Sequence, residues 1–195
     1  QFHAISDFKA MSRLYKLVSR WLITFSIPIM LIIIMYPVKV MLLFGPNYMD
    51  SASVLVLLTI ATFVQTILGA AGPALSMSGH TRLVFWNSLG AFILNLVLNI
   101  IFIPKFGIIG AAWATLISMT AISFTRIIQV RFILKLSFLS SHLYKPLLAG
   151  MATWIGIRSI HSFVMGFHTI VTLSIVFFCS ILIYGFVLWF LKLEP

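Results

Sequence analysis

Six long runs of apolar residues divide the sequence, and each is close to the length of a helix that crosses a bilayer. Such a helix needs about 20 predominantly apolar residues. The runs cover residues 21–44, 51–77, 84–104, 108–125, 147–164 and 169–191, with turns predicted at SGHTR (78–82) and IPKFG (103–107). Only 8% of the residues are charged, whereas a soluble domain has about 25%. The sequence therefore predicts an all-α fold, a polytopic membrane helix bundle with six transmembrane helices.

Basic residues gather on one side of these predicted helices. With both chain ends placed in the cytoplasm, ten of the 13 Lys and Arg residues fall in cytoplasmic segments. The exceptions are Lys39, Lys105 and Arg158. An excess of Lys and Arg in cytoplasmic loops sets the orientation of membrane helices. We therefore expect a multi-pass protein of the cell (cytoplasmic) membrane with both ends in the cytoplasm.

Residues 1–20 precede the first apolar run and have an amphipathic pattern. At about 100° per residue their basic side chains fall within a narrow arc. These side chains are Lys9, Arg13, Lys16 and Arg20. A basic amphipathic helix binds to the headgroups of an anionic leaflet. We expect a cytoplasmic amphipathic surface helix over 1–20, with anionic membrane lipids as its partners; a helix that binds a cytosolic protein is the alternative.

The sequence lacks the motifs of several enzyme classes. It contains no GxxxxGK[ST] phosphate loop, no HExxH pair and no GxSxG nucleophile turn. The five His residues are scattered, so we expect no metal site and no cofactor. The three acidic residues, Asp7, Asp50 and Glu194, lie away from membrane depth, where proteolysis or proton relay would need them. We expect no enzyme, and no nucleic-acid partner, because the +10 net charge reflects scarce acids.

Three asparagines share one face of the third apolar run. Asn87, Asn95 and Asn99 lie within about 120° of one another on a helical wheel. Unpaired amides in hydrocarbon cost several kcal/mol, so this face must contact other helices or water. Hydrogen bonds between helices are one interpretation. The lining of a hydrophilic cavity is the other.

Glycine and proline interrupt two of the predicted helices. The second run ends with Gly69, Gly72 and Pro73, which weaken or kink a helix and free carbonyl groups. The fourth run begins with Gly107 and Gly110, followed by alanines, and small side chains let two backbones approach closely. We expect these five residues to serve helix packing or a hinge.

Arg82 and Arg126 stand at predicted cytoplasmic boundaries. A guanidinium can hold a phosphate through two parallel hydrogen bonds. An arginine at an inner boundary can also serve only to anchor the topology. None of the predicted well-buried positions is a basic residue. Residues 126–145 form a basic stretch that we expect to be the loop between the fourth and fifth runs.

Two segments resemble a known family of membrane proteins. They are LFGPNYMDSASVLVLLTIA and, further on, LSMSGHTRLVFWNSLGAFILNLVLNIIFIPKFGIIGAAWAT, within residues 43–118. The LFG followed by Tyr48, the Asn-rich run that ends in a proline turn and the GIIGAAWAT segment are similar, in order and spacing, to the polysaccharide (O-antigen and teichoic acid) flippases. That family belongs to the multidrug/oligosaccharidyl-lipid/polysaccharide exporter superfamily, with the lipid II flippases and the multidrug and toxin extrusion transporters.

The resemblance implies a two-lobed transporter with a central cavity, of which this chain is the carboxy-terminal part. Residues 21–134 would form the four-helix core of the second lobe, and residues 135–195 a basic cytoplasmic loop with two additional transmembrane helices. The missing amino-terminal lobe would be a partner. The implied function is a flippase, a secondary transporter that moves a lipid-linked oligosaccharide or polysaccharide precursor across the cytoplasmic membrane by alternating access.

The resemblance also implies roles for the residues above. The asparagines at 87, 95 and 99 would line the cavity for the glycan, and Arg82 and Arg126 would attract its pyrophosphate. The glycines and Pro73 would let the lobes move. The alternatives are a multidrug cation antiporter of the same superfamily, a polysaccharide polymerase, and a non-catalytic membrane scaffold or inactive fragment. An antiporter needs ionisable groups at membrane depth.

Overall fold

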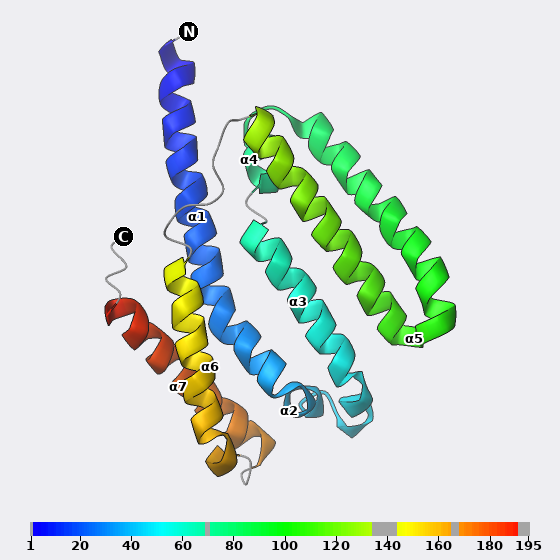
Figure 1. Cartoon of the computed structure of the whole chain (residues 1–195), viewed down its shortest axis with the longest axis vertical. Coiled ribbons are helices and arrows are strands. Elements are labelled where there is room, and N and C mark those ends of the chain that lie inside the picture. Colours follow the sequence, from blue (N-terminus) through cyan, green and yellow to red (C-terminus); the bar gives the residue numbers. More distant parts are fainter. Residues whose placement is uncertain (1, 69–70, 134–143, 165–167, 191–195) are drawn as a thin grey trace. The chain divides into compact units, whose positions relative to one another are not determined.

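The computed structural model describes residues 2–68, 71–133, 144–164 and 168–190 (Figure 1). Every regular element in these ranges is a helix, which confirms the predicted all-α class. The elements in order are α1 (Phe2–Met35), α2 (Pro37–Leu42), the 3-10 helix η1 (Pro46–Ser51), α3 (Ala52–Leu68), α4 (Ala71–Met77), α5 (Thr81–Ile133), α6 (Tyr144–Val164) and α7 (Thr169–Phe190).

The helices group into two compact units. Unit 1 comprises Gln1–Ile23 and Ile60–Ser140, and unit 2 comprises Thr24–Thr59 and Ser141–Pro195. This grouping follows contacts and does not test the predicted boundaries at residues 20 and 134, which stay predictions. Helix α1 runs without a break past residue 20, so the surface helix and the first apolar run form one element.

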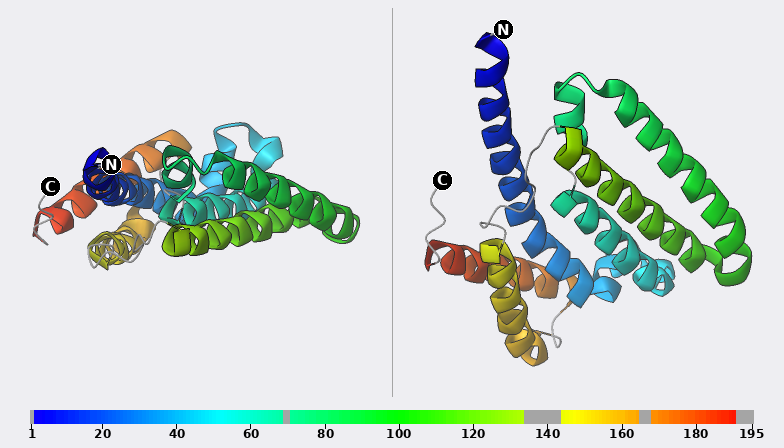
Figure 2. Two further views of the ribbon diagram at one scale, coloured as in Figure 1. Left: turned by 90° about the horizontal axis from the view of Figure 1, so that it is seen from above. Right: turned by 45° about the horizontal axis from the view of Figure 1, so that its top comes forward.

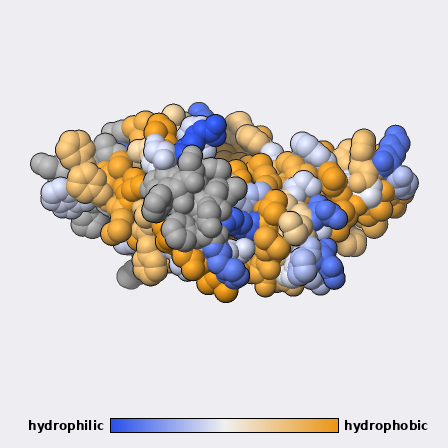
Figure 3. Space-filling model, turned by 90° about the horizontal axis from the view of Figure 1, so that it is seen from below, coloured by the Kyte–Doolittle hydropathy of each residue, from blue (hydrophilic) through white to orange (hydrophobic). Residues whose placement is uncertain are grey.

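Four described segments are long and apolar enough to cross a membrane. They are Leu17–Met35, Pro46–Leu68, Thr81–Ile133 and Thr169–Phe190. Large apolar side chains cover their outer faces, as the hydrophobic surface in Figure 3 illustrates, and Trp189 is 75% exposed. The chain is therefore an all-helical protein with several helices suited to a bilayer, while the count of six spans stays a prediction.

Helix α5 is a helical hairpin with two arms. Its 53 residues would extend about 80 Å as a straight helix, more than twice the apolar thickness of a bilayer. The chain instead reverses at Gly107, whose φ of 59° and ψ of −139° are not helical. Figures 1 and 2 show the arms side by side. The predicted third and fourth runs are these arms, and the turn predicted at residues 103–107 is confirmed.

Two glycines make this reversal possible. Gly107 has a positive φ, which L side chains rarely adopt. At Gly110 a Cβ atom would overlap the carbonyl oxygen of Phe102 and lie 2.6 Å from its carbonyl carbon. The close backbone approach predicted for Gly110 is therefore present, between the last turn of the first arm and the first turn of the second.

Helix α4 packs against α5 within unit 1. Ala71, Ala74 and Leu75 form a buried cluster with Val130 of the second arm. Gly79, with a φ of 84°, ends α4, and the His80 N–H donates to the Leu75 carbonyl at 2.9 Å. This bond, with that from the Gly79 N–H to the Ser76 carbonyl, is a Schellman motif, so α5 begins directly afterwards.

The kink expected near the end of the second run falls partly outside the described residues, because Gly69 is not among them. Gly72 and Pro73 are helical and lie within α4. A kink of this run stays a prediction.

Unit 2 is built on α6, which packs against α7 and the second half of α1. Ile32 of α1 and Tyr36, the residue before α2, form a buried cluster with Ile157 of α6 and Val176 of α7. Lys39 of α2 donates a hydrogen bond from Nζ to Thr172 Oγ1 of α7 at 2.8 Å. These contacts tie three helices and α2 into one unit.

Candidate functional site

Polar side chains meet where the two arms of α5 face each other. We call this set the polar seam, and its members are Asn87, Ser88, Asn95, Asn99, Ser118, Arg126 and Gln129. The opposite faces of both arms carry exposed apolar residues such as Ile93, Ile100 and Ile128. The hairpin is thus apolar outside and polar along its inner line.

Asn87 and Gln129 form a reciprocal amide pair in this seam. Asn87 Nδ2 donates to Gln129 Oε1 at 2.5 Å, and Gln129 Nε2 donates to Asn87 Oδ1 at 3.0 Å. Asn87 is buried, with 8% of its surface exposed. Gln129 is not among the residues predicted from the sequence, because residues 126–145 read as a loop. That interpretation is wrong for residues 126–133, which continue the second arm of α5.

Asn95 and Asn99 also contact the opposite arm or each other. Asn95 Nδ2 donates to Ser118 Oγ at 3.0 Å, and Asn99 Nδ2 donates to Asn95 Oδ1 at 2.8 Å. Ser118 Oγ donates in turn to the Ala114 carbonyl at 2.8 Å. These bonds agree with the interpretation that the asparagines join helices. Both asparagines keep part of their surface exposed, and the lining of a cavity stays a prediction.

Arg126 lies within the seam rather than in a loop. One of its terminal nitrogens, Nη2, donates to Ser88 Oγ at 3.3 Å, and its Nε is buried without a hydrogen-bond partner among the described residues. Arg126 as a whole is half-buried, and the buried residues that the structure describes include no Lys or Arg, as expected. The second arm of α5 nevertheless extends far enough to enclose this one nitrogen. Residues 71–133 contain no acidic side chain, so no carboxylate of α4 or α5 neutralises the guanidinium.

Arg82 differs from Arg126 in its surroundings. It is exposed in the first turn of α5, six residues before Ser88, or about 9 Å along the arm. Nearby, Ser78 Oγ lies 3.0 Å from His80 Nδ1 and donates to the Leu75 carbonyl. Because that hydroxyl hydrogen is used, the imidazole donates from Nδ1 to Ser78. The structure therefore brings Arg126, but not Arg82, into contact with seam residues.

The sequence was compared with protein families, curated proteins and solved structures. No family model, curated protein or solved structure matches it. The resemblance to the flippases stays an expectation from the quoted segments.

The described residues offer amides, hydroxyls and one guanidinium at the seam. They contain no group of three or more His, Cys, Asp and Glu side chains that could hold a metal ion. Amides and hydroxyls can bind the hydroxyl groups of a sugar, and a guanidinium can bind an oxyanion. The seam therefore suits a polar, anionic ligand.

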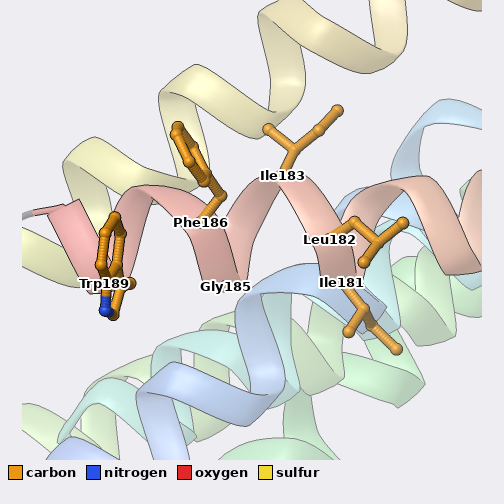
Figure 4. A pocket seen from close by; sticks show the side chains of 6 residues that line it. All are labelled: Ile181, Leu182, Ile183, Gly185, Phe186 and Trp189. Carbon is orange, nitrogen blue, oxygen red and sulfur yellow. The ribbon is translucent and has the colours of Figure 1, made fainter.

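An apolar hollow lies on α7. Its lining residues are Ile181, Leu182, Ile183, Gly185, Phe186 and Trp189 (Figure 4). In Figure 4 Ile183 and Phe186 extend from one side of α7, and Leu182 from another. The indole nitrogen of Trp189 is the one polar side-chain atom in this lining. The hollow suits a hydrocarbon chain and offers no group for chemistry.

Proposed function

We propose that this chain is part of a membrane flippase, a secondary transporter that moves a lipid-linked oligosaccharide or polysaccharide precursor across the cytoplasmic membrane by alternating access. The proposal includes six spans, both ends in the cytoplasm, and a second lobe completed by an amino-terminal lobe. The polar seam supports it, since long apolar helices rarely carry polar residues without a role. Arg126 strengthens this support, because an uncompensated guanidinium attracts an anionic group.

Each part of the seam has a role in this proposal. Asn87, Asn95 and Asn99 bind or guide the glycan, exchanging their interhelical hydrogen bonds for bonds to sugar hydroxyls. Arg126, aided by the exposed Arg82, attracts the pyrophosphate from the cytoplasmic side. Gly107 and Gly110 form the turn about which the arms of α5 can move together.

Cysteine accessibility tests whether water reaches the seam. In a Cys179→Ser background, single substitutions Asn95→Cys and Asn99→Cys are labelled in intact cells with a membrane-impermeant maleimide. Leu96→Cys and Val97→Cys are matched controls, because these exposed residues face away from the seam. The proposal predicts labelling at 95 and 99 only. The absence of labelling at all four positions would contradict a hydrated path.

Transport tests the role of the guanidinium. Proteoliposomes with a lipid-linked oligosaccharide in one leaflet receive an impermeant reagent that modifies sugars in the other leaflet. Arg126→Ala should slow the transfer, and Arg126→Lys should restore part of it because the charge is kept. Arg131→Ala is the control, since Arg131 is exposed on the same arm. Equal rates in all variants would refute the role of Arg126.

A membrane scaffold is the second candidate, and one observation favours it. The amide of Asn87 both donates to and accepts from the amide of Gln129, so it has partners without a ligand. A scaffold would keep these bonds permanently and leave the seam dry. The maleimide experiment separates the two candidates, because only the flippase requires water beside Asn95 and Asn99.

A further inference from the structure

We infer that the Asn87–Gln129 amide pair and Gly72 are positioning elements for Arg126. The pair sets the register of the two arms of α5, and Gly72 leaves room for the guanidinium beside α4. The inference rests on the proposed function in one respect, since that function supplies the anion that Arg126 meets. The positioning itself is a property of unit 1 and can be tested without transport.

The first step concerns register. Gln129 follows Arg126 by three residues, about one helical turn, and Asn87 directly precedes Ser88. The two reciprocal hydrogen bonds, at 2.5 and 3.0 Å, require that the amides lie directly opposite each other. A slip by one residue moves an arm about 1.5 Å along its axis and would lengthen both bonds beyond their range. The pair therefore fixes the register in which Ser88 faces Arg126.

The second step concerns space. A Cβ atom built on Gly72 would lie 3.6 Å from Arg126 Nη1, 3.8 Å from Cζ and 3.9 Å from Cδ. The end of the Arg126 side chain thus lies directly over this glycine. The buried cluster of Ala71, Ala74 and Leu75 with Val130 holds α4 at that place. A β-branched side chain at 72 would occupy the space that the guanidinium now fills.

The third step concerns the hydrogen bonds of the guanidinium. It has five N–H donors, of which one contacts Ser88 at 3.3 Å and the buried Nε has no partner among the described residues. This weak set of bonds does not by itself hold the side chain in one place. The register from the amide pair and the space at Gly72 supply the constraint that these bonds lack.

The test is the rate at which phenylglyoxal modifies each arginine, followed by mass spectrometry of the purified full chain in detergent. Arg131, exposed on the same arm, is the internal control. In the wild type Arg126 should react at least about tenfold more slowly than Arg131. The double variant Asn87→Leu/Gln129→Met removes both amides with little change in size. Losing two hydrogen bonds should raise the Arg126 rate about tenfold or more.

The swapped double variant Asn87→Gln/Gln129→Asn distinguishes positioning from general damage. It keeps a reciprocal amide pair of the same total length, so Arg126 should again react slowly. If Arg126 reacts at the same rate in the wild type, in the Leu/Met variant and in the swapped variant, the amide pair does not position it.

Gly72 gives a second measurement if the seam variants fail to fold. Gly72→Ala adds a Cβ atom at ordinary contact distance and should leave the Arg126 rate unchanged. Gly72→Val adds two methyl groups and should raise it several-fold, with Arg131 unchanged. If Arg126 reacts at the same rate in Gly72→Ala and Gly72→Val, the role of Gly72 is overturned. Transport is judged separately: if Arg126→Ala leaves the transfer rate unchanged, the proposed function fails while the positioning stands.

Discussion

The substitution Gly110→Ala should destabilise the α5 hairpin, because the added methyl group has no room. Its Cβ would overlap the Phe102 carbonyl oxygen and lie 2.6 Å from the carbonyl carbon and 3.1 Å from the Phe102 Cβ. The first two atoms belong to the backbone of the facing arm, so no change of rotamer relieves the contact. The two arms must separate beside the turn at Gly107.

The expected magnitude follows from two opposing terms. Overpacking of this kind costs about 1–3 kcal/mol, and a contact with backbone places it at the upper end. Replacing Gly by Ala inside a helix returns about 1 kcal/mol of helix propensity. The net loss should be about 2 kcal/mol, which lowers Tm by roughly 4–8 °C for a chain of this size.

Thermal unfolding in detergent, followed by the loss of helical circular dichroism, measures this change in stability. Gly90→Ala is the matched control, because it lies in the same hairpin and a Cβ there meets no atom within 4 Å. That variant should be as stable as the wild type or more stable. Equal shifts in Tm for the two variants would refute the reasoning, since only Gly110 has the close backbone contact.

Three further predictions concern the packing of both units. Gly150→Ala should lower stability by about 1 kcal/mol, because its Cβ would lie 2.8 Å from Ile27 Cγ2, a methyl group that moves only if χ1 of Ile27 changes. Gln129→Ala should cost about 1–3 kcal/mol, because it leaves the buried amide of Asn87 without its partner. Thr172→Val should cost about 0.5–1.5 kcal/mol by removing the acceptor at 2.8 Å from Lys39 Nζ. The same thermal assay measures all three.

Each of these predictions has a control in the chain. Gly156→Ala tests the first, because its Cβ meets the flexible end of Ile183 at 2.9 Å and should be tolerated better than the change at Gly150. For the amide, the double variant Asn87→Leu/Gln129→Met should cost less than Gln129→Ala, because it leaves no polar group unpaired. Thr153→Val is the control for Thr172→Val, because Thr153 is equally buried and its hydroxyl donates only to the Ala149 carbonyl of its own helix. It should cost less than Thr172→Val, since that carbonyl keeps its helical hydrogen bond. If a control variant lowers Tm more than the variant with which it is compared, the contact proposed for that pair is wrong.

Local sequence patterns predicted the turns of unit 1 well. The turn at residues 103–107 was predicted from proline and glycine, and Gly107 carries the positive φ that closes it. The short loop at residues 78–82 was predicted in the same way and is the Schellman turn at Gly79. Such turns depend on which residues tolerate a left-handed backbone, and this property belongs to single residues.

Patterns failed where a helix continued past a change in composition. Arg126 and Gln129 lie in a stretch rich in basic residues, which looked like a cytoplasmic loop. In the structure α5 extends to Ile133, because Ile127 and Val130 pack against α4 and keep this last part helical. Packing between elements distant in sequence decides such an extension, and no local pattern records it.

The sequence by itself determined that this chain is all-helical and suited to a membrane, because long apolar runs in hydrocarbon must satisfy their backbone hydrogen bonds internally. It also determined that Asn87, Asn95 and Asn99 share a face, since a helix has a fixed period. Only the tertiary structure decided what that face meets. The partners Gln129 and Ser118 lie 42 and 23 residues further along the chain, and the reversal at Gly107 brings them opposite. A helical period places side chains around one axis, whereas the register between two arms follows from the turn that joins them.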